Sequence, residues 1–312
     1  LAEKYRYPWL VGGIAGSLFL VVFMAFISCR INYTTTAALA GAAAVVQLLT
    51  VRCWDWRKSA TVRAYALSLL LLVNAYCLRA QSALPALAFC TLVFVWFVYL
   101  RLQRGDDKHA LRCVLLAAMV MFVTIGALWG IRQAEIGLRG LQSEIDWHRA
   151  RTALMDYTPF ESDPAPALAA DSGLSAAQVE MVRQWYFLDA AVTTQALQTM
   201  ADAYTDVARP GAISRLSDFL LEFPRYPFTL GLLVALCGLY WFGNRKTAPL
   251  GGVVALLGVL GAAALLLLLS WQGRIPARAA DAALTPCAAL LMGLVLTCHV
   301  NPLTKGTGKR IV

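Results

Sequence analysis

The chain has 312 residues, of which 59 % are hydrophobic and 14 % charged, and its mean hydropathy is +0.62. Soluble domains carry roughly 25 % charged residues, so this composition excludes an ordinary cytosolic or secreted globular protein. The net charge of +9 is typical of a membrane protein with basic cytoplasmic loops, so we expect no nucleic-acid partner. The eight cysteines form no CxxC pair, which favours packing residues over metal ligands.

Apolar stretches long enough to cross a bilayer recur along the chain. A membrane-spanning helix needs about 20 apolar residues and at least about 17. Eight stretches reach or approach this length: 9–29, 34–50, 61–78, 83–100, 110–131, 227–242, 249–271 and 282–300. The second is mostly Ala and Thr, the third contains Arg63 and Asn74, and the sixth is short. The sequence predicts an all-α polytopic membrane protein with about eight transmembrane helices.

The positions of Lys and Arg predict the orientation, because short basic loops stay on the cytoplasmic side. With both termini inside, 15 Lys and Arg fall in cytoplasmic segments and only four in the short external loops. The remaining eight lie between the fifth and sixth helices. We therefore expect eight crossings with both termini in the cytoplasm.

Residues 132–226 differ in charge from the rest of the chain. They contain thirteen Asp and Glu against eight Arg and no Lys. A segment of this length is large enough for a small domain. We expect three parts: a five-helix transmembrane part (1–131), an acidic extracytoplasmic helical insertion (132–226), and a three-helix transmembrane part with a basic cytoplasmic tail (227–312).

The insertion is predicted to be helical throughout. Its first part, 132–156, reads as the fifth helix continuing out of the bilayer, with an apolar stripe that includes Leu138 and Met155. Helix 176–188 has a clear start, because Ser175 and Gln178 can form a capping box. Leu174 and Val179 supply a hydrophobic staple for the same helix.

Two more helices are expected beyond it, at 194–207 and in a short amphipathic segment around Phe219. Trp185, Tyr186 and Phe187 are candidate core residues. Three consecutive aromatic side chains cannot all face inward, so at least one should be exposed.

Ionisable residues are densest between 144 and 156, just beyond the fifth predicted span. Glu144 and His148 are four residues apart and can share a helix face, but a structural ion network is favoured over catalysis. The chain has no HExxH, GxSxG or GxxxxGK[ST] motif and no glycine-rich dinucleotide turn. We predict no catalytic residue, no metal site and no cofactor, and an enzyme is not favoured.

The run HRARTALMDY (148–157), followed by GLSAAQVEMVRQWYFLD (173–189), resembles the external segment of a family of uncharacterised multi-pass membrane proteins of Gram-positive anaerobic bacteria. The resemblance covers roughly residues 145–206. It implies a bacterial cytoplasmic (inner) membrane and an extracytoplasmic helical insertion. The family has no activity that can be assigned to individual residues of this chain.

The favoured function is a scaffold or subunit that recognises a partner through the insertion, in a cell-envelope assembly. One alternative is a lipid-handling enzyme or flippase in which Arg149 and Arg151 contact a phosphate; another is a channel or transporter. The expected partners are the lipid bilayer and another membrane or envelope protein, and the oligomeric state stays open, as does a disulfide between Cys29 and Cys77. The candidate partner or lipid-headgroup contacts are His148, Arg149, Arg151, Asp156, Trp185 and Asp189.

Overall fold

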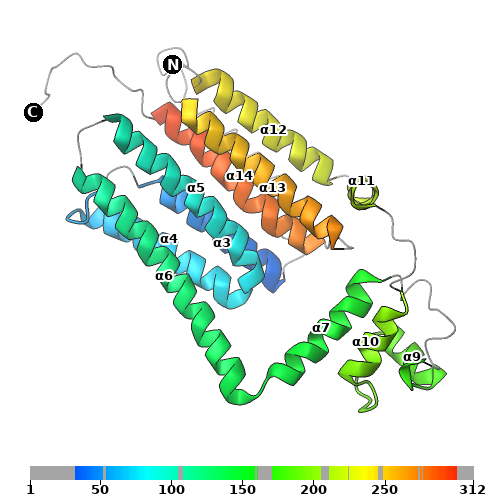
Figure 1. The fold of residues 1–312 in the computed structure, drawn as a ribbon. Coiled ribbons are helices and arrows are strands. Elements are labelled where there is room, and N and C mark those ends of the chain that lie inside the picture. The colour runs from blue at the N-terminus through cyan, green and yellow to red at the C-terminus, as the bar shows by residue number, and fades with distance from the viewer. Residues whose placement is uncertain are drawn as a thin grey trace, which may run out of the picture. The chain divides into compact units, whose positions relative to one another are not determined.

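All regular secondary structure in the described part of the chain is helical (Figure 1). The computed structural model describes residues 32–51, 54–104, 108–158, 160, 171–204, 211–223, 225–244, 249–272, 275 and 277–300. These residues form α3 (Tyr33–Leu49), α4 (Ser59–Leu78), α5 (Ala80–Arg104), α6 (Lys108–Arg139), α7 (Gln142–Tyr157), α9 (Ala176–Arg183), α10 (Thr194–Asp202), α11 (Ala212–Glu222), α12 (Arg225–Asn244), α13 (Pro249–Trp271) and α14 (Ala277–Val300).

The chain divides into two compact units. The bundle unit comprises the described residues within Leu1–Ile125, Leu220–Leu266 and Pro276–Val312. The insertion unit comprises those within Gly126–Phe219 and Leu267–Ile275. Helix α6 contributes its first part to the bundle unit and its last part to the insertion unit.

Five of the described helices, α4, α5, α6, α13 and α14, are long and apolar enough to cross a membrane. Helix α3 and a segment of α12, Thr229–Gly238, are apolar but shorter. The all-helical fold therefore fits a multi-pass membrane protein, as the sequence predicts. The eight crossings stay a prediction, and the first predicted span, 9–29, lies outside the described residues.

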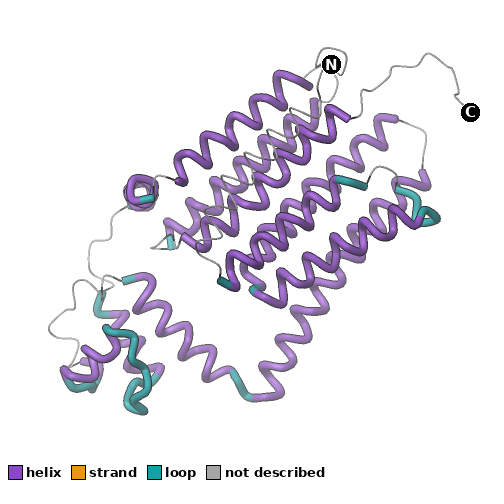
Figure 2. The backbone as a smooth tube through the Cα atoms, turned by 180° about the vertical axis from the view of Figure 1, so that it is seen from behind, coloured by secondary structure: helices purple, strands orange, loops and turns teal. Residues whose placement is uncertain are grey.

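Helix α3 packs against α4, α5 and α14 within the bundle unit, and Figure 2 draws the regular structure of the described residues entirely as helix. It starts at an Asn32 cap, whose side-chain oxygen accepts from the backbone N–H of Thr34 and Thr35 at 2.9 and 3.0 Å. A Cβ on Gly41 would lie 2.5 Å from the Cβ of Ala86 on α5. The Ala- and Thr-rich sequence that weakened this predicted span thus serves close helix packing, for which small residues are needed.

Side-chain hydrogen bonds to neighbouring helices add to this packing. They join Ser68 Oγ to the Ala44 carbonyl at 2.8 Å, Tyr65 Oη to the Ala117 carbonyl at 2.7 Å, and Tyr226 Oη to the Ala277 carbonyl at 2.8 Å and Asp281 Oδ1 at 3.1 Å. Asp281 belongs to α14 because this helix begins at Ala277, earlier than the predicted residue 282. The predicted eighth span, 282–300, therefore left out an acid in the second turn of this helix.

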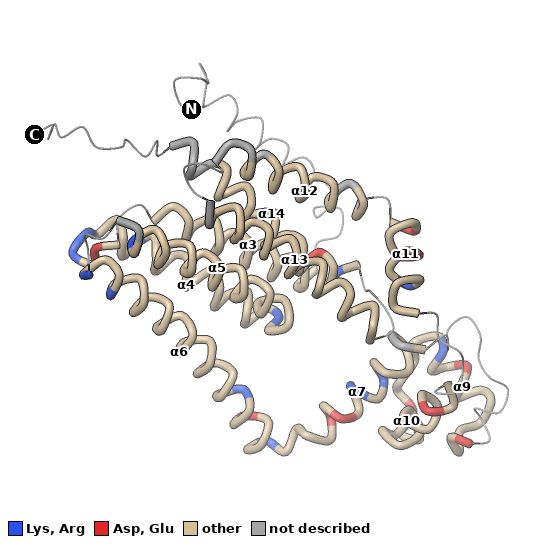
Figure 3. Tube along the Cα trace, turned by 45° about the horizontal axis from the view of Figure 1, so that its top comes forward, with Lys and Arg blue, Asp and Glu red and all other residues tan. Residues whose placement is uncertain are grey.

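Lys and Arg residues of the bundle unit gather along the chain where α4 begins, α5 ends and α6 begins (Figure 3). Arg57 and Lys58 lie in the turn before α4, Arg101 lies near the end of α5, and Lys108 and Arg112 lie in the first turns of α6.

Helix α6 ends at Arg139, so the prediction that the fifth helix continues through residue 156 is wrong. Gly140 has a φ of 64°, the left-handed conformation that glycine adopts without steric cost. The Leu141 N–H bonds to the Ile136 carbonyl at 3.1 Å, as in a Schellman motif. The chain then turns into α7. The predicted apolar stripe is buried only in part, because Leu138 is 88 % exposed while Met155 belongs to the core of the insertion unit.

The insertion unit has its own core between α7, α9 and α10. Helix α9 starts at Ser175 with the predicted capping box, in which the Gln178 N–H donates to Ser175 Oγ at 3.3 Å and Ser175 N–H donates to Gln178 Oε1 at 2.9 Å. Leu174 and Val179 are both buried, as expected for the staple. The buried residues of the core are Ala150, Leu154, Met155, Phe160, Leu174, Val179, Val182, Val192, Ala196, Leu197, Met200, Ala201 and Tyr204.

Of the remaining helices of the insertion unit, α10 is shorter than predicted and α11 is the predicted amphipathic helix around Phe219. Helix α10 ends at Asp202 rather than at residue 207, and 205–210 lie outside the described residues. Helix α11 is amphipathic with Phe219 buried, and its first residue, Ala212, accepts a hydrogen bond from the Ser270 hydroxyl.

Candidate functional site

A cation surrounded by three aromatic rings stands out in the insertion unit. The guanidinium carbon of Arg151 lies 5.7 Å from the ring centroid of Trp147, 6.0 Å from that of Trp185 and 5.6 Å from that of Phe187. Each distance is within the range of a cation–π interaction. No ion pair found between described side chains includes Arg151. We call these four residues the Arg151 cluster.

Helix α7 supplies two members of the cluster. Trp147 precedes Arg151 by four residues, so the two side chains share one face of the helix. The Trp147 indole N–H donates to the Val192 carbonyl at 2.8 Å, which fixes the plane of the ring. Phe187 meets Trp147 edge to face at 5.6 Å, an arrangement that aromatic pairs prefer.

The other two members follow the end of helix α9. This helix ends at Arg183, so the predicted end near residue 188 is wrong. Trp185 N–H bonds to the Val182 carbonyl at 3.0 Å, and Tyr186 N–H bonds to the Met181 carbonyl at 2.8 Å. This pair of bonds is a Schellman motif. In such a motif the residue just after the helix C-cap, here Trp185, has a left-handed backbone conformation.

Trp185 occupies that left-handed position with a φ of 67°, and it is the one non-glycine residue with positive φ in the described chain. A side chain at such a position costs roughly 1 kcal/mol relative to glycine. Strained backbone of this kind persists where surrounding contacts hold it. Here the contacts are the cation–π contact of Trp185 with Arg151 and its edge-to-face contact with Phe187, whose ring centroid is 6.2 Å away.

The segment around Trp185 exposes an unusual amount of apolar surface. Trp185 is 48 % exposed, Tyr186 57 % and Leu188 93 %. Phe187 instead packs partly against the core. The prediction of core residues is therefore wrong for Trp185 and Tyr186, while the expectation that at least one of the three aromatics is exposed is confirmed. We call Arg151, Trp185, Tyr186 and Leu188 the aromatic surface. Trp, Tyr and Arg are the residue types that dominate binding energy at protein interfaces.

Asp189 closes the segment that carries the aromatic surface. Its carboxylate accepts from Gln178 Nε2 at 2.8 Å and from the Ala191 N–H at 2.9 Å. The Gln178 side-chain bond, followed by the Ala191 backbone bond, lowers the pKa of Asp189 below its ordinary value. The carboxylate therefore ties α9 to the 189–191 turn and has a local structural use.

Of the remaining predicted contacts, His148 touches a member of the cluster, Arg149 pairs with another residue, and the side chain of Asp156 lies outside the description. The His148 ring lies edge to face with Trp147 at 5.2 Å. Arg149 pairs with Asp146 at 3.2 Å, and its side chain is 73 % exposed. The side chain of Asp156 lies outside the described residues. The structure thus brings together Arg151 and Trp185 of the six predicted contacts, and the assignment of all six as contacts stays a prediction.

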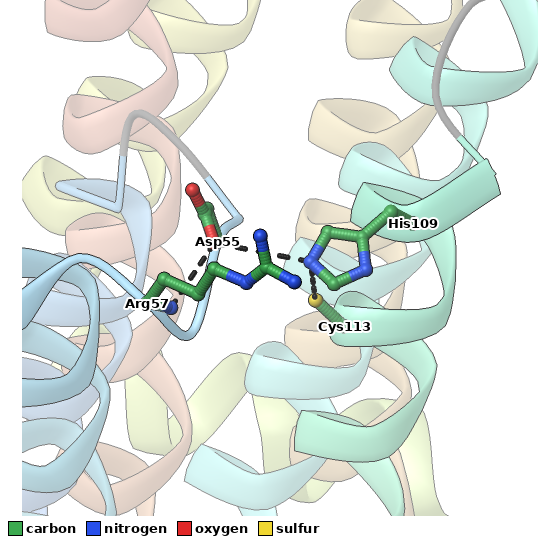
Figure 4. A network of polar contacts seen from close by, with 4 residues as sticks. All are labelled: Asp55, Arg57, His109 and Cys113. Carbon is green, nitrogen blue, oxygen red and sulfur yellow. Dashed lines mark hydrogen bonds and ion pairs between the residues drawn. The ribbon is translucent and has the colours of Figure 1, made fainter.

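A second polar group lies in the bundle unit (Figure 4). His109 Nε2 is 3.8 Å from Asp55 Oδ1 and 3.6 Å from Cys113 Sγ. A nucleophile–base–acid relay needs the histidine to use its two different nitrogens, whereas both neighbours here share Nε2. The group therefore anchors the turn before α4 to the first turns of α6.

No group of three or more His, Cys, Asp or Glu side chains among the described residues is placed to hold a metal ion. Cys77 is a free thiol, while Cys29, its suggested disulfide partner, lies outside the description. Comparisons with protein-family models, with curated proteins and with solved structures give no match to this chain.

Proposed function

We propose that this protein is a multi-pass membrane scaffold or subunit that recognises a partner protein of the cell envelope through its insertion unit. The observation that carries the proposal is the Arg151 cluster, whose member Trp185 is exposed together with the following Tyr186 and Leu188. Rigid aromatic and Arg side chains on packed elements are efficient anchors for a partner, because little side-chain entropy remains to be lost on binding.

The charge of Arg151 adds specificity to this surface. The guanidinium carbon of Arg151 lies over three ring faces, and a guanidinium carries five N–H donors in its own plane. A carboxylate or a backbone carbonyl of a partner can accept from those groups while its apolar side chains cover Trp185 and Leu188. The aromatic surface would then combine a charged anchor with an apolar one.

The proposal includes a topology of eight crossings with both termini in the cytoplasm and the insertion outside, in the inner membrane of a bacterium. Its main support is that all six lysines, 4, 58, 108, 246, 305 and 309, fall in segments which this topology leaves inside. The resemblance of residues 145–206 to multi-pass proteins of Gram-positive anaerobes agrees with this topology, and we propose that kinship as well.

Site-specific photo-crosslinking tests the proposed recognition. A photo-reactive amino acid replaces Tyr186 in the full chain, which is expressed in its native membrane. We expect one discrete protein adduct, reduced about tenfold by Arg151→Ala or Trp185→Ala, as removal of one interface anchor predicts. Arg149→Ala is the matched control, because it removes a neighbouring Arg that already pairs with Asp146.

Two outcomes contradict the proposal. Adducts to lipid alone would favour the alternative of a lipid-handling protein. An adduct reduced equally by Arg149→Ala would show that general charge, not the Arg151 cluster, governs the contact. An impermeant thiol reagent tests the topology separately, by labelling a single cysteine introduced at Asp171 in an otherwise cysteine-free chain.

A further inference from the structure

Helix α6 presents a continuous stripe that changes from basic to apolar along its length. Lys108 and Arg112 begin the stripe, and both are exposed. Exposed apolar side chains continue it on the same helix face at steps of three and four residues: Leu115, Leu116, Met119, Phe122 and Val123. Val123 follows Arg112 by eleven positions, which is about 16 Å of helix.

This length matches the hydrocarbon part of one leaflet, which is half of a bilayer core about 30 Å thick. A phospholipid has the same layout, with a charged head followed by acyl chains of leaflet length. The stripe thus offers matching chemistry along one lipid molecule. None of this depends on what the insertion unit binds.

The turn before α4 brings more positive charge to the head of the stripe. The contact of Asp55 with His109 at 3.8 Å holds this turn against the first turns of α6. In Figure 4 the Arg57 side chain extends from the turn toward the His109 ring. Across the two connecting segments, 52–63 and 101–112, the sequence has eight Lys and Arg against three Asp.

Aromatic side chains gather at the same end of the bundle unit. Trp54 packs against Tyr65 at 6.4 Å and Phe97 at 5.3 Å, and Trp96 stacks on Tyr99 at 6.3 Å. Trp54, Tyr65 and Trp96 are buried, while Phe97 and Tyr99 are partly exposed. Trp and Tyr are enriched at the level of lipid headgroups, so this grouping agrees with a headgroup phosphate near the basic residues.

We infer that the start of α6 and the turn before α4 form a binding site for one anionic phospholipid. Lys108, Arg112 and Arg57 hold the headgroup phosphate, and the apolar part of the α6 stripe holds an acyl chain. Basic pockets between transmembrane helices are a general mode of anionic headgroup recognition. Charge complementarity favours an anionic lipid over a zwitterionic one.

Native mass spectrometry of the full-length protein in detergent tests this inference. Dioleoyl phosphatidylglycerol and dioleoyl phosphatidylcholine are added at equal concentration, so that only the headgroup charge differs. We expect phosphatidylglycerol to be retained at least tenfold more. The double variant Lys108→Gln with Arg112→Gln should lose about thirtyfold in retention, since each basic side chain near an anionic surface contributes about fivefold.

The matched control is Arg132→Gln with Arg139→Gln, which makes the same charge change on the last turns of the same helix. It should leave retention unchanged. Soluble glycerol phosphate should not compete, because it lacks the acyl chain; Met119→Ser should weaken retention of both lipids. Equal retention of the two lipids, equal loss in the control, or full competition by glycerol phosphate would each overturn the inference. Both double variants change exposed side chains, and circular dichroism checks that they fold.

Discussion

The bundle unit and the insertion unit distribute apolar side chains in opposite ways. In the bundle unit, α3 buries alanines and threonines, while the outward faces of α6 and α13 carry large apolar residues such as Val123 and Leu260. In the insertion unit, large apolar residues such as Leu154 and Leu197 are buried. The first pattern suits lipid as solvent and the second suits water. The surface of the bundle unit therefore suits lipid, and the buried core of the insertion unit suits a domain in water.

The largest expected effect is a loss of stability that is confined to the insertion unit. Leu154 is fully buried in the core of the insertion unit, so Leu154→Ala should cost about 2–5 kcal/mol there. Hydrogen exchange in detergent should rise across α7, α9 and α10 and stay unchanged in α3 and α14. Leu260→Ala, which removes the same atoms from an exposed position on α13, is the control and should raise exchange nowhere. Equal loss of protection in both units by Leu154→Ala would show that they fold as one.

Close helix packing in the bundle unit gives the next effect. A Cβ on Gly41 would meet the Cβ of Ala86 at 2.5 Å, so Gly41→Ala should destabilise the bundle unit by about 1–3 kcal/mol. Ala86→Gly in the same chain should restore most of the loss, because it removes the atom that clashes. Gly126→Ala, where no atom lies within 4 Å, should cause no loss. Thermal unfolding in detergent measures all four proteins, and a double variant no better than Gly41→Ala would refute this contact.

Local signals in the sequence predicted helix starts better than helix ends. The capping box at Ser175 and the staple of Leu174 and Val179 are formed by neighbouring residues, so the start of α9 was predictable. Its end depends on Trp185 in a left-handed conformation, which no glycine announces. Gly140 did offer such a signal, but the apolar spacing around it favoured one continuous helix.

The candidate site was only partly predictable for the same reason. Arg151 and Trp185 were identified as separate candidates, and the spacing of Trp147 to Arg151 was visible as an i, i+4 pair. Their joint arrangement depends on how the segment after α9 packs against α7. Such a contact between segments 34 residues apart follows from tertiary packing, which residue spacing does not reveal. The same holds for His109 and Asp55 in the bundle unit.

The insertion unit contains two Schellman motifs, one with Gly140 and one with Trp185 at the left-handed position. Substitutions at these two positions should therefore have different effects on stability. Gly140→Ala should destabilise by about 1 kcal/mol, because alanine is strained at positive φ. Trp185→Gly should relieve a similar strain but lose the stacking on Arg151, which is worth about 0.5–1 kcal/mol. The net change in stability should be close to zero while partner crosslinking falls. Urea unfolding of the insertion unit, monitored by hydrogen exchange, distinguishes the two variants. A large loss of stability in Trp185→Gly would mean that the indole is mainly a core residue.

The smallest effect concerns pH and the turn that follows the aromatic surface. Gln178 and the Ala191 N–H lower the pKa of Asp189, so the carboxylate binds protons less readily in the folded state than in the unfolded state. Its contribution to stability is therefore present above the unfolded pKa of about 4 and is lost as the pH falls through the lower folded pKa. Amide exchange at Ala191, corrected for the intrinsic pH dependence, should lose protection over that acid range in the wild type.

Asp189→Asn should remove this pH dependence, because an amide does not titrate, while Asp171→Asn, an exposed acid elsewhere in the insertion unit, should preserve it. Protection at Ala191 that falls equally in the wild type and in Asp189→Asn would assign the acid sensitivity to another group. If instead Asp189→Asn loses partner crosslinking at neutral pH with the turn intact, the carboxylate contacts the partner directly, as the sequence proposed, rather than only fixing the segment that carries Trp185.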